Sequence, residues 1–430
     1  MNLLKNIFLL LIAALLIFPA LQKRFIFISS APLKGLFQLQ EKPLFSMSSW
    51  FSGTYQQQYQ KYRDDQPGFR PDLVRLFNQI DYSLFSQPHA AKIIVGNKGY
   101  LFGDQYIEAF IGTNFTGEKY IDQQVKKLKY LQDFFWNKKK ILLLTIFTPD
   151  KGTFYPEMIP DRFLAKKQEK NNYSCFVKKC QEAGINVIDF NSLFLLMKDT
   201  SKYILYPKTG VHWSTYGAVL AADSLTKYLD KKLGIRMPDI VVDSIILSKI
   251  PRDEDDDISR TMNLIFPVTQ PPLAYPSYHY SSDSTVKKPS ALFIGDSFYW
   301  NWYNSGIISN LFSNEPFWYY DKEVYPENKT RPLNTGLIDL RSNIENQDVI
   351  ILMQVNGGWG NLGYGFIDRA FTEYDTSIID PVRKIEASMR NSRDYMNLLA
   401  KKAKERNVTL DAMIRIDAIY IYNQELRKKK

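Results

Sequence analysis

Four short and continuous apolar runs lie in the central part of the chain. They are Ile141–Phe147, Asn186–Phe190, Ser290–Gly295 and Asp348–Val355. Runs of this length fit strands that are buried on both faces of a sheet. Helical patterns separate them, for example Ile121–Trp136 and Asn172–Glu182, and they imply crossover connections. The pattern therefore predicts an α/β fold with a mostly parallel sheet flanked by helices, and its ligand site is expected just beyond the carboxyl ends of the strands.

The flanking parts of the chain have different patterns. Residues 25–90 are rich in Phe, Gln, Ser and Pro and predict a membrane-proximal stalk with short helices. Ile93–Phe102 contains two β runs around Asn97-Lys98-Gly99, which predicts a hairpin. From Arg383 onward, apolar residues recur at helical spacing on both sides of Asn407, so two amphipathic helices packed on the body are expected. The predicted regions are 1–24, 25–90, 91–370 and 371–430.

The first 24 residues have a pattern that is typical of membrane insertion. Lys5 precedes an apolar run from Ile7 to Leu21, and Lys23 and Arg24 follow it. The uncharged stretch just reaches the lower limit of about 17 residues for a spanning helix. Because no small-x-small cleavage site follows, an uncleaved signal anchor is preferred over a cleaved signal peptide, and a buried helix is the third alternative. We therefore expect a single-pass protein of the inner membrane whose bulk is periplasmic or otherwise extracytoplasmic.

The composition argues against nucleic-acid binding and against a zinc cluster. The 430 residues include 55 Lys and Arg against 45 Asp and Glu, which gives a net charge of +10. These basic residues are scattered and form no basic-aromatic motif, so no nucleic-acid partner is expected. Three histidines and two cysteines cannot supply a Cys/His zinc cluster, and no metal or other cofactor is expected. Cys175 and Cys180 are five apart on a predicted helix, about 140° around its axis, and are expected to be unpaired.

A first short motif carries candidate chemistry. Gly295, Asp296 and Ser297 come directly after a predicted buried strand. A serine at a strand-to-helix turn has its hydroxyl raised at the carboxyl edge of the sheet, and backbone N–H groups at the helix start can face a developing oxyanion. Gly295 permits a tight turn. The structural alternative is that Asp296 or Ser297 simply caps the following helix.

A second motif supplies a candidate base. His212 lies in the segment Thr209–Ala218, immediately before a predicted helix. Histidine is the usual general base for a serine near neutral pH. The alternative is a packed histidine beside Trp213. His89 and His279 are expected in loops, the second in a Tyr-rich one, where both are structural or solvated.

Together, the two motifs resemble the SGNH-hydrolase-like proteins of bacterial polysaccharide O-acetylation, the alginate O-acetyltransferase family. The resemblance covers roughly residues 90–370. Ile93–Phe102 is similar to the opening β segment of the family, and Thr148–Glu157 is similar to the loop after the next strand. The serine follows the histidine by 85 residues, from 212 to 297. This order matches the family and is the reverse of that in ordinary SGNH esterases.

The resemblance implies an SGNH-like fold and assigns roles to residues. Ser297 would be the nucleophile and His212 the general base. The family places an aspartate two residues before the histidine to orient the imidazole, and here that position is Gly210. Two alternatives are open. Either a Ser–His dyad acts without a third residue, or a carboxylate from elsewhere, such as one in the run Asp253–Asp257, orients the imidazole. Asp296 is expected to cap or brace the turn.

Further residues are candidates for the same edge of the sheet. A glycine-rich stretch follows the last apolar run, and Asn356 and Asn361 in it are candidates to donate to the oxyanion. Trp213 and Trp359 are candidate substrate-binding residues that would stack on sugar rings. Trp300 and Trp302 are weighed with them, and two of the four are expected to be core residues.

These observations lead to a functional expectation. The protein is expected to move an acetyl or small acyl group to hydroxyls of a cell-surface or exported polysaccharide. The resemblance implies a membrane-bound O-acyltransferase as the partner that supplies the acyl group, and the positive charge would suit an acidic glycan. Two alternatives remain open. One is an SGNH esterase or deacetylase with water as acceptor, and the other is a catalytically inactive glycan-binding subunit of an envelope assembly, which Gly210 favours.

Overall fold

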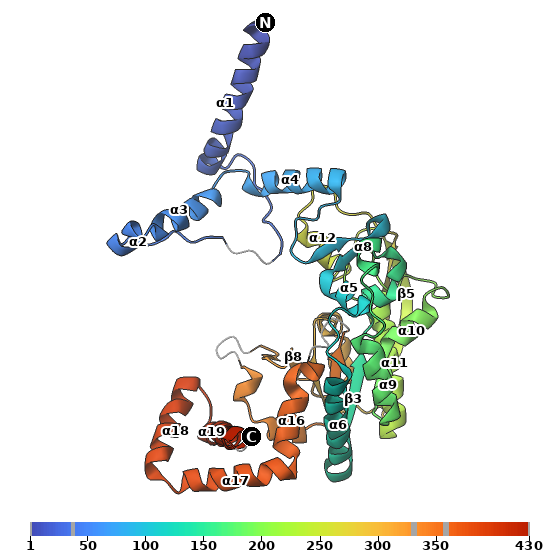
Figure 1. The fold of residues 1–430 in the computed structure, drawn as a ribbon. Coiled ribbons are helices and arrows are strands. Elements are labelled where there is room, and N and C mark those ends of the chain that lie inside the picture. Colours follow the sequence, from blue (N-terminus) through green and yellow to red (C-terminus); the bar gives the residue numbers. More distant parts are fainter. Residues whose placement is uncertain (1, 36–38, 328–332, 356–360, 429–430) are drawn as a thin grey trace. The chain divides into compact units, whose positions relative to one another are not determined.

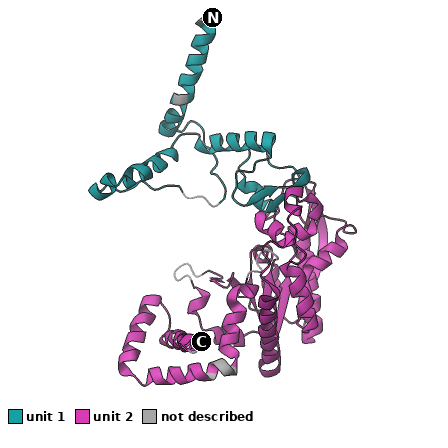
Figure 2. Ribbon diagram, viewed as in Figure 1, with its two compact units in different colours: residues 1–103, 208–210, 256–270 teal, residues 104–207, 211–255, 271–430 magenta. Residues whose placement is uncertain are grey.

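The computed structural model describes residues 2–35, 39–327, 333–355 and 361–428. The chain folds as two compact units (Figure 2). Unit 1 comprises residues 1–103, 208–210 and 256–270, and unit 2 comprises residues 104–207, 211–255 and 271–430. The four regions predicted from the sequence divide the chain along its length, whereas the two units are compact in space. The boundaries of the four regions stay a prediction.

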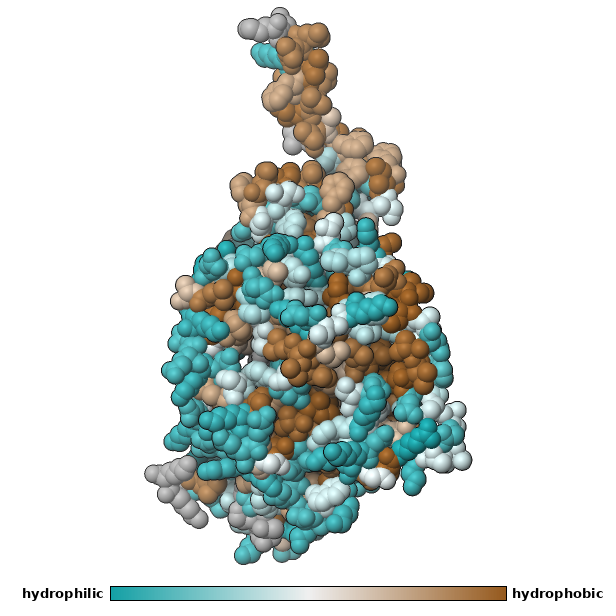
Figure 3. Space-filling view, turned by 90° about the vertical axis from the view of Figure 1, so that its right-hand side faces the viewer, coloured by the Kyte–Doolittle hydropathy of each residue, from teal (hydrophilic) through white to brown (hydrophobic). Residues whose placement is uncertain are grey.

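Unit 1 begins with a long apolar helix, α1 (Asn2–Phe25). The segment Leu3–Phe25 is long and apolar enough to cross a bilayer, a property that signal sequences share, and it is not buried in the protein. Figure 3 shows apolar side chains covering this helix. Lys23 and Arg24 stand in its last turn, where cations face the negative end of the helix dipole. An N-terminal apolar helix of the predicted kind is therefore present.

The rest of unit 1 consists of short elements (Figure 1). They are α2 (Met47–Phe51), α3 (Thr54–Asp64), α4 (Arg70–Phe85), β1 (Ile93–Val95), η1 (Asn97–Gly99), β2 (Leu101–Gly103) and α12 (Asp257–Thr261). β1 and β2 pair antiparallel, with Ile93 opposite Gly103. The hairpin predicted for this segment is confirmed.

A six-stranded sheet forms the centre of unit 2. Its strand order is β4-β3-β10-β7-β8-β9. The bounds are β3 (Leu142–Phe147), β4 (Val187–Asp189), β7 (Ala291–Gly295), β8 (Phe317–Tyr319), β9 (Glu323–Tyr325) and β10 (Val349–Gln354). All neighbours are parallel except β8 and β9. The predicted α/β fold with a mostly parallel sheet is confirmed, and the four predicted strands are β3, β4, β7 and β10.

The two faces of the sheet are covered by different helices. Side chains on one face, such as Leu292 and Ile350, pack in one core with α6, α9 and α16. On the other face, Phe293 contacts the rings of Tyr299 and Phe312. The alternation follows from the two-residue period of a strand. Because both faces are covered, every residue of β3, β7 and β10 is buried, which explains their continuous apolar runs.

The helical elements of unit 2 surround this sheet and continue into the tail. They are α5 (Asp104–Ile111), α6 (Glu118–Phe134), η2 (Phe135–Lys139), α7 (Lys151–Phe154), η3 (Pro156–Met158), α8 (Asp161–Leu164), α9 (Asn172–Glu182), α10 (Phe190–Met197), α11 (Thr215–Leu233), α13 (Tyr299–Asn304), α14 (Ile307–Leu311), η4 (Thr335–Leu337), α15 (Leu340–Glu345), η6 (Leu362–Gly365), α16 (Phe366–Tyr374), α17 (Thr376–Arg390), α18 (Arg393–Arg406) and α19 (Leu410–Lys428).

One prediction about the loops is wrong. β5 (Ile240–Ser248) and β6 (Leu273–Tyr280) form a long antiparallel pair, where the sequence predicted only a Tyr-rich loop around His279. His279 lies in β6 opposite Val241, and its Nδ1 is 2.8 Å from the Asp243 carboxylate. The physical reason is that β5 has no buried residue and that Asp243 and Ser244 interrupt its apolar residues, so it lacks the continuous apolar run that marks the buried strands.

The C-terminal helices are confirmed, but their number differs from the prediction. The stripe assigned to one helix belongs to two, α17 and α18, because Ser392 accepts a hydrogen bond from the Tyr395 N–H and starts a new helix. Asn407 ends α18 in a left-handed conformation with φ of 55°, as predicted. α17, α18 and α19 share an apolar cluster that includes Met389, Leu399 and Met413.

A nearly buried carboxylate connects this tail to the body. Glu373 in α16 accepts hydrogen bonds from Arg341 on one oxygen and from Arg415 of α19 on the other, the second at 2.9 and 3.0 Å. Its side chain is 11% exposed. Such a charge is stable only while both guanidinium groups compensate it.

We predict that Glu373→Gln lowers the free energy of unfolding by about 2 kcal/mol, because the partly buried Arg341 loses its charged partner and Arg415 keeps only Glu386. The exposed pair between Arg390 and Asp411 offers a matched control, since Asp411 is 79% exposed. Asp411→Asn should cost less than about 0.5 kcal/mol. Urea denaturation of both variants measures the two changes, and equal losses would contradict the role of Glu373.

Candidate active site

A histidine and a serine meet at the carboxyl edge of the sheet. The Nε2 atom of His212 lies 2.7 Å from the Oγ atom of Ser297. His212 is buried, and Ser297 is half-buried. A hydrogen bond of this length lets the imidazole take the proton of the hydroxyl as the oxygen attacks a carbon. The two residues that the sequence singled out are therefore side by side.

The strand β7 places Ser297. β7 ends at Gly295, which is paired with Met353 of β10. A Cβ atom on Gly295 would lie 2.9 Å from the Met353 carbonyl oxygen, so only glycine fits this close approach without a shift. The chain then turns through Asp296 and enters α13 at Tyr299. The predicted strand-to-helix turn is present at Ser297.

Asp296 is at the centre of the hydrogen bonds that hold this turn. Its carboxylate accepts from the Phe298 N–H at 3.0 Å, from the Val355 N–H at 2.7 Å and from the Tyr364 hydroxyl at 2.8 Å. Burial raises the pKa of Asp296, while these bonds and the charge of His212 act in the opposite direction. The carboxylate thus fixes the nucleophile turn to the end of β10 and also lies within electrostatic reach of the imidazole.

The start of α11 places His212. Ser214 caps this helix, because its Oγ atom accepts from the Gly217 N–H at 3.0 Å and donates to the Ile204 carbonyl at 2.7 Å. The ring of Phe298 stands edge-on to the imidazole, with centroids 4.7 Å apart. The histidine is therefore held both by a capped helix start and by the residue that follows Ser297.

The expectation that Trp213 stacks on a sugar ring is corrected. Trp213 is fully buried and contacts the rings of Phe190, Phe298 and Trp302. A ligand cannot reach a side chain that is enclosed in this way. Trp213 is a core residue that packs α11 against α13, and Trp302, which is also fully buried, reinforces this packing by donating to the Ala218 carbonyl at 2.8 Å.

Tyr320, which the sequence did not predict as a site residue, lies beside Ser297. It follows β8, and its N–H donates to the Gly295 carbonyl at 2.8 Å. Burial raises the pKa of its hydroxyl, while the neighbouring Ser297 hydroxyl acts in the opposite direction, so the phenol keeps its proton near neutral pH. Tyr320 also packs on Tyr364, with centroids 5.0 Å apart. The aromatic run Phe317–Tyr320, which is rich in strand-forming residues, was the pattern that could have identified β8 and this edge position.

One residue of the acidic run Asp253–Asp257, namely Asp255, has a structural role. Asp255 is buried and accepts hydrogen bonds from the N–H and hydroxyl of Thr215, at 3.1 and 3.2 Å, and from the Tyr275 hydroxyl. Burial raises the pKa of Asp255 to about 7. Asp255 thus binds the first turn of α11, the helix that follows His212. The idea that this run supplies the orienting carboxylate stays a prediction.

The remaining site predictions fall in the glycine-rich stretch after β10. Asn356 and Trp359 lie outside the described residues. Asn361 is exposed, and its carbonyl oxygen accepts from the Tyr364 N–H at 2.9 Å and from the Gln354 side chain at 3.4 Å. Its role toward an oxyanion stays a prediction.

The two cysteines form no disulfide, and the described residues hold no cluster of metal ligands. Cys175 and Cys180 are both free, so the prediction that they are unpaired is confirmed. Within the described residues, no group of three or more His, Cys, Asp or Glu side chains has the arrangement of a metal site.

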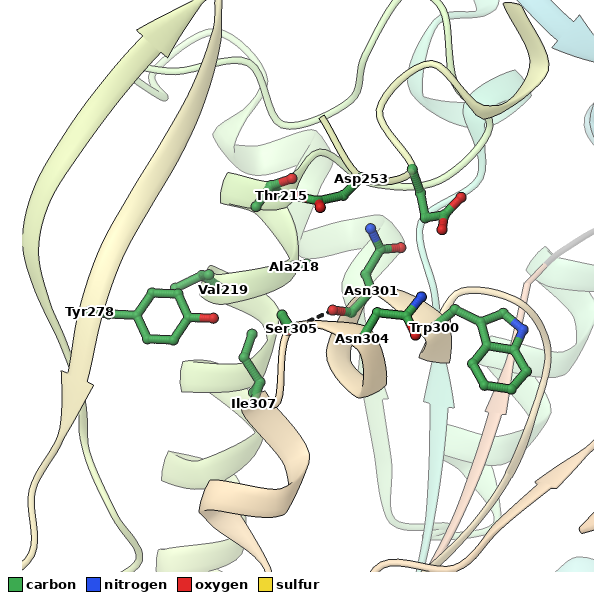
Figure 4. A pocket seen from close by; sticks show the side chains of 11 residues that line it. Thr215, Ala218, Val219, Asp253, Tyr278, Trp300, Asn301, Asn304, Ser305 and Ile307 are labelled. Carbon is green, nitrogen blue, oxygen red and sulfur yellow. Dashed lines mark hydrogen bonds between the residues drawn. The ribbon is translucent and has the colours of Figure 1, made fainter. Parts of the chain in front are cut away.

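A small cavity lies between the two helices that follow the catalytic pair. It has a volume of about 130 Å³, and its lining includes Thr215 of α11, Asn301 of α13 and Tyr278 of β6. Figure 4 shows these side chains together with the indole of Trp300, which points away from Tyr278 and Val219. Neither His212 nor Ser297 lines this cavity, so it is separate from the reacting atoms.

Part of the chain matches a known protein family. Residues 93–243 match the family model described as the SGNH hydrolase-like domain of acetyltransferase AlgX. The predicted family resemblance is confirmed. The matched segment contains His212 and ends before Ser297. A search of curated proteins finds no significant match.

Several solved structures share features of this SGNH-like fold. The O-acetyltransferase domain of Pseudomonas putida AlgJ has 12% identity and a TM-score of 0.42, over 66% of this chain and 99% of that one. Pseudomonas aeruginosa AlgX has 15% identity and a TM-score of 0.41, over 64% and 67%. Bacillus cereus PatB1 has 12% identity and a TM-score of 0.40, over 64% and 99%.

The buried carboxyl of Asp255 predicts a pH dependence of stability. Its pKa rises from 3.8 to about 7 on folding, so the native state binds more protons between these values and stability falls as the pH rises through this window. Asp255→Asn should flatten the fall between about pH 4 and 7 in urea denaturation series. Asp339→Asn, at the exposed cap of α15, should leave the slope unchanged. A slope identical in the wild type and Asp255→Asn would contradict the assignment.

Tyr320 predicts a change in the reactivity of Ser297. We expect Tyr320→Phe to slow the labelling of Ser297 by phenylmethylsulfonyl fluoride by about three- to tenfold, because the hydroxyl proposed to donate a hydrogen bond of about 1 kcal/mol at the reacting serine is lost. Intact mass spectrometry follows the labelling. Tyr130→Phe is the control, since it removes a hydroxyl that donates to the Tyr374 carbonyl at 3.2 Å. A labelling rate that is unchanged in Tyr320→Phe would remove the proposed positioning role.

Proposed function

We propose that this chain is an extracytoplasmic, serine-dependent O-acyltransferase that moves an acetyl or small acyl group to hydroxyls of a polysaccharide. The observation that carries the proposal is the 2.7 Å contact between His212 Nε2 and Ser297 Oγ. The match of residues 93–243 to the AlgX acetyltransferase domain supports acyl transfer as the reaction class. Hydroxyl groups of a glycan are the acceptors that this reaction class requires.

The first half-reaction acylates the serine. His212 takes the proton of Ser297 as Oγ attacks the carbonyl carbon of the acyl donor. The carbonyl oxygen becomes an oxyanion, and the Ser297 N–H and the Tyr320 hydroxyl are the donors proposed to stabilise it. When the intermediate collapses, the bond to the leaving group breaks and the imidazolium returns its proton to that group. The product is an acyl ester on Ser297.

The second half-reaction transfers the acyl group. A sugar hydroxyl attacks the ester carbonyl and gives its proton to His212. The intermediate then expels Ser297 Oγ, which receives the proton from the imidazolium. The acyl group now forms an ester with the sugar, and the enzyme is restored with no net change in its protons. If water occupies the position of the sugar hydroxyl, the same steps describe an esterase.

Asp296 is proposed to compensate in part for Gly210. In both half-reactions His212 becomes positively charged, and a nearby carboxylate lowers the energy of that state. The mutual electrostatic effect of His212 and Asp296 supports this role. Because Asp296 also accepts bonds from Val355 and Tyr364, its position is fixed before the reaction begins.

The location and partners of the protein are part of the same proposal. α1 is proposed as a signal anchor in the inner membrane, which would keep the catalytic domain on the extracytoplasmic side. A membrane-bound O-acyltransferase is proposed to deliver the acyl group across the membrane. The acceptor is proposed to be a cell-surface or exported polysaccharide.

The central test is direct detection of the acyl-enzyme. Full-length protein in detergent is incubated with 4-nitrophenyl acetate and digested for peptide mapping. We expect an acetyl adduct on Ser297, no adduct in Ser297→Ala, and a rate about 10² to 10⁴ times lower in His212→Asn, since the general base is lost. Ser309→Ala is the control, because Ser309 is exposed and its hydroxyl only donates to the Gly306 carbonyl at 3.1 Å.

The outcomes separate the three functional classes. Transfer of the acetyl group from Ser297 to an added glycan supports the acyltransferase. An adduct that is released only to water supports the esterase. Absence of any adduct, together with full cellular O-acetylation in a Ser297→Ala strain, would contradict catalysis and favour the inactive glycan-binding subunit.

A further inference from the structure

A cluster of aromatic side chains with partial exposure lies beside the nucleophile turn. We call it the aromatic platform, and its members are Trp300, Tyr303, Tyr319, Tyr320 and Tyr325. They come from α13, from β8 and the residue that follows it, and from β9. The ring of Trp300 is 5.5 Å from Tyr303, 5.3 Å from Tyr319 and 4.9 Å from Tyr325 between centroids. Residues from three elements therefore form one continuous aromatic surface.

The platform is continuous with the reacting atoms. Tyr320 is bound to Gly295 through its backbone, and its ring packs on Tyr364, whose hydroxyl donates to Asp296 beside Ser297. The rings of Tyr320 and Tyr319 are 4.4 Å apart, and Tyr319 in turn contacts Trp300. A path of ring contacts thus leads from the serine to the indole.

A second aromatic cluster provides an internal comparison. Trp213, Phe298 and Trp302 are fully buried, which is the expected state of rings whose function is to pack two helices together. Trp300 is only two residues from Trp302, yet it and the four tyrosines of the platform remain partly open to solvent. Packing alone does not require five partly exposed rings next to a reactive serine.

The orientation of the indole is fixed by its neighbours. Trp300 stands at 87° to Tyr325 and at 90° to the buried Phe317. Trp300 also lines the small cavity between α11 and α13, and Figure 4 shows its indole at the end of that cavity away from Tyr278. A ligand stacked on the indole would also meet the rings of Tyr319 and Tyr325, which come from β8 and β9. A ring held in this way loses little entropy when it binds a ligand.

We propose that the aromatic platform is the subsite that binds a pyranose ring of the acceptor glycan. The inference rests on the proposed function and specifies where its acceptor lies. A pyranose has an apolar face of C–H groups that packs on aromatic rings, and its hydroxyls can exchange hydrogen bonds with tyrosine hydroxyls. A sugar on Trp300 and Tyr319 would present a hydroxyl toward Ser297 along the path through Tyr320.

The first test measures binding without catalysis. Full-length Ser297→Ala protein in detergent is titrated with cellohexaose, chitohexaose and hexamannuronate, which are neutral, N-acetylated and acidic, and binding is followed by calorimetry. We expect saturable binding of at least one probe. Adding Trp300→Ala should weaken it about tenfold, since a stacking surface is lost, and Trp300→Phe should weaken it less because a flat ring remains.

Trp136→Ala is the matched control. Trp136 is 42% exposed and lies in η2, before the start of β3, so it is near the amino edge of the same sheet and not the carboxyl edge. Its removal should leave binding unchanged. Absence of binding by all three probes, or equal affinities in the Trp300→Ala and Trp136→Ala proteins, would overturn the proposal.

A second test separates this proposal from the proposed function. In protein that retains Ser297, Trp300→Ala should raise the half-saturating concentration of the acceptor about tenfold, whereas Trp136→Ala should leave both that concentration and the rate of serine acetylation by 4-nitrophenyl acetate unchanged. A parallel loss of serine acetylation and of the unfolding midpoint would mean that Trp300 is structural and would overturn the subsite. If wild-type Ser297 forms no adduct, the proposed function is wrong. The calorimetric test still shows whether the aromatic platform binds a glycan.

Discussion

The hydrogen bond between His212 and Ser297 is the interaction on which the functional interpretation depends. It joins side chains that are 85 residues apart, one just before α11 and the other just after β7. Ser297 is fixed by the end of β7, where Gly295 touches the backbone of β10. His212 is fixed by the capped start of α11. The bond from Trp302 to Ala218 then ties α13 to α11 directly, so the distance between the imidazole and the serine hydroxyl is set by core packing.

Burial of charge is the second constraint on this edge of the sheet. Asp296 is fully enclosed, and an enclosed carboxylate is stable only with several donors. Two backbone N–H groups and the Tyr364 hydroxyl supply them. These donors come from the nucleophile turn, from the end of β10 and from η6, so a single carboxylate holds three segments of the site. This arrangement explains how the turn keeps its geometry.

Much of this could be predicted from the sequence, for an identifiable physical reason. The runs that became β3, β7 and β10 are buried on both faces, and burial on both faces produces a continuous apolar pattern. Their parallel pairing follows from the helices between them, and it places Ser297 at a predictable edge. β5 escaped prediction because it has no buried residue and because Asp243 and Ser244 interrupt its apolar run, and β8 because it has only three residues. Tyr320 was missed together with β8, since its position has meaning only once that strand is known.

Trp300 and Trp302 show which part of the site could not be predicted from the sequence. Trp300 and Trp302 are two residues apart, and on a helix this separation is about 200°, so the two side chains must point to opposite sides of α13. The helix pattern alone therefore requires that one indole face inward if the other faces outward. Which one does so depends on the position of α11, and that contact is made by Trp213 and Ala218, more than 80 residues earlier in the chain. The long-range packing that brings His212 to Ser297 is thus the same packing that turns Trp302 into the core and leaves Trp300 beside the reactive serine.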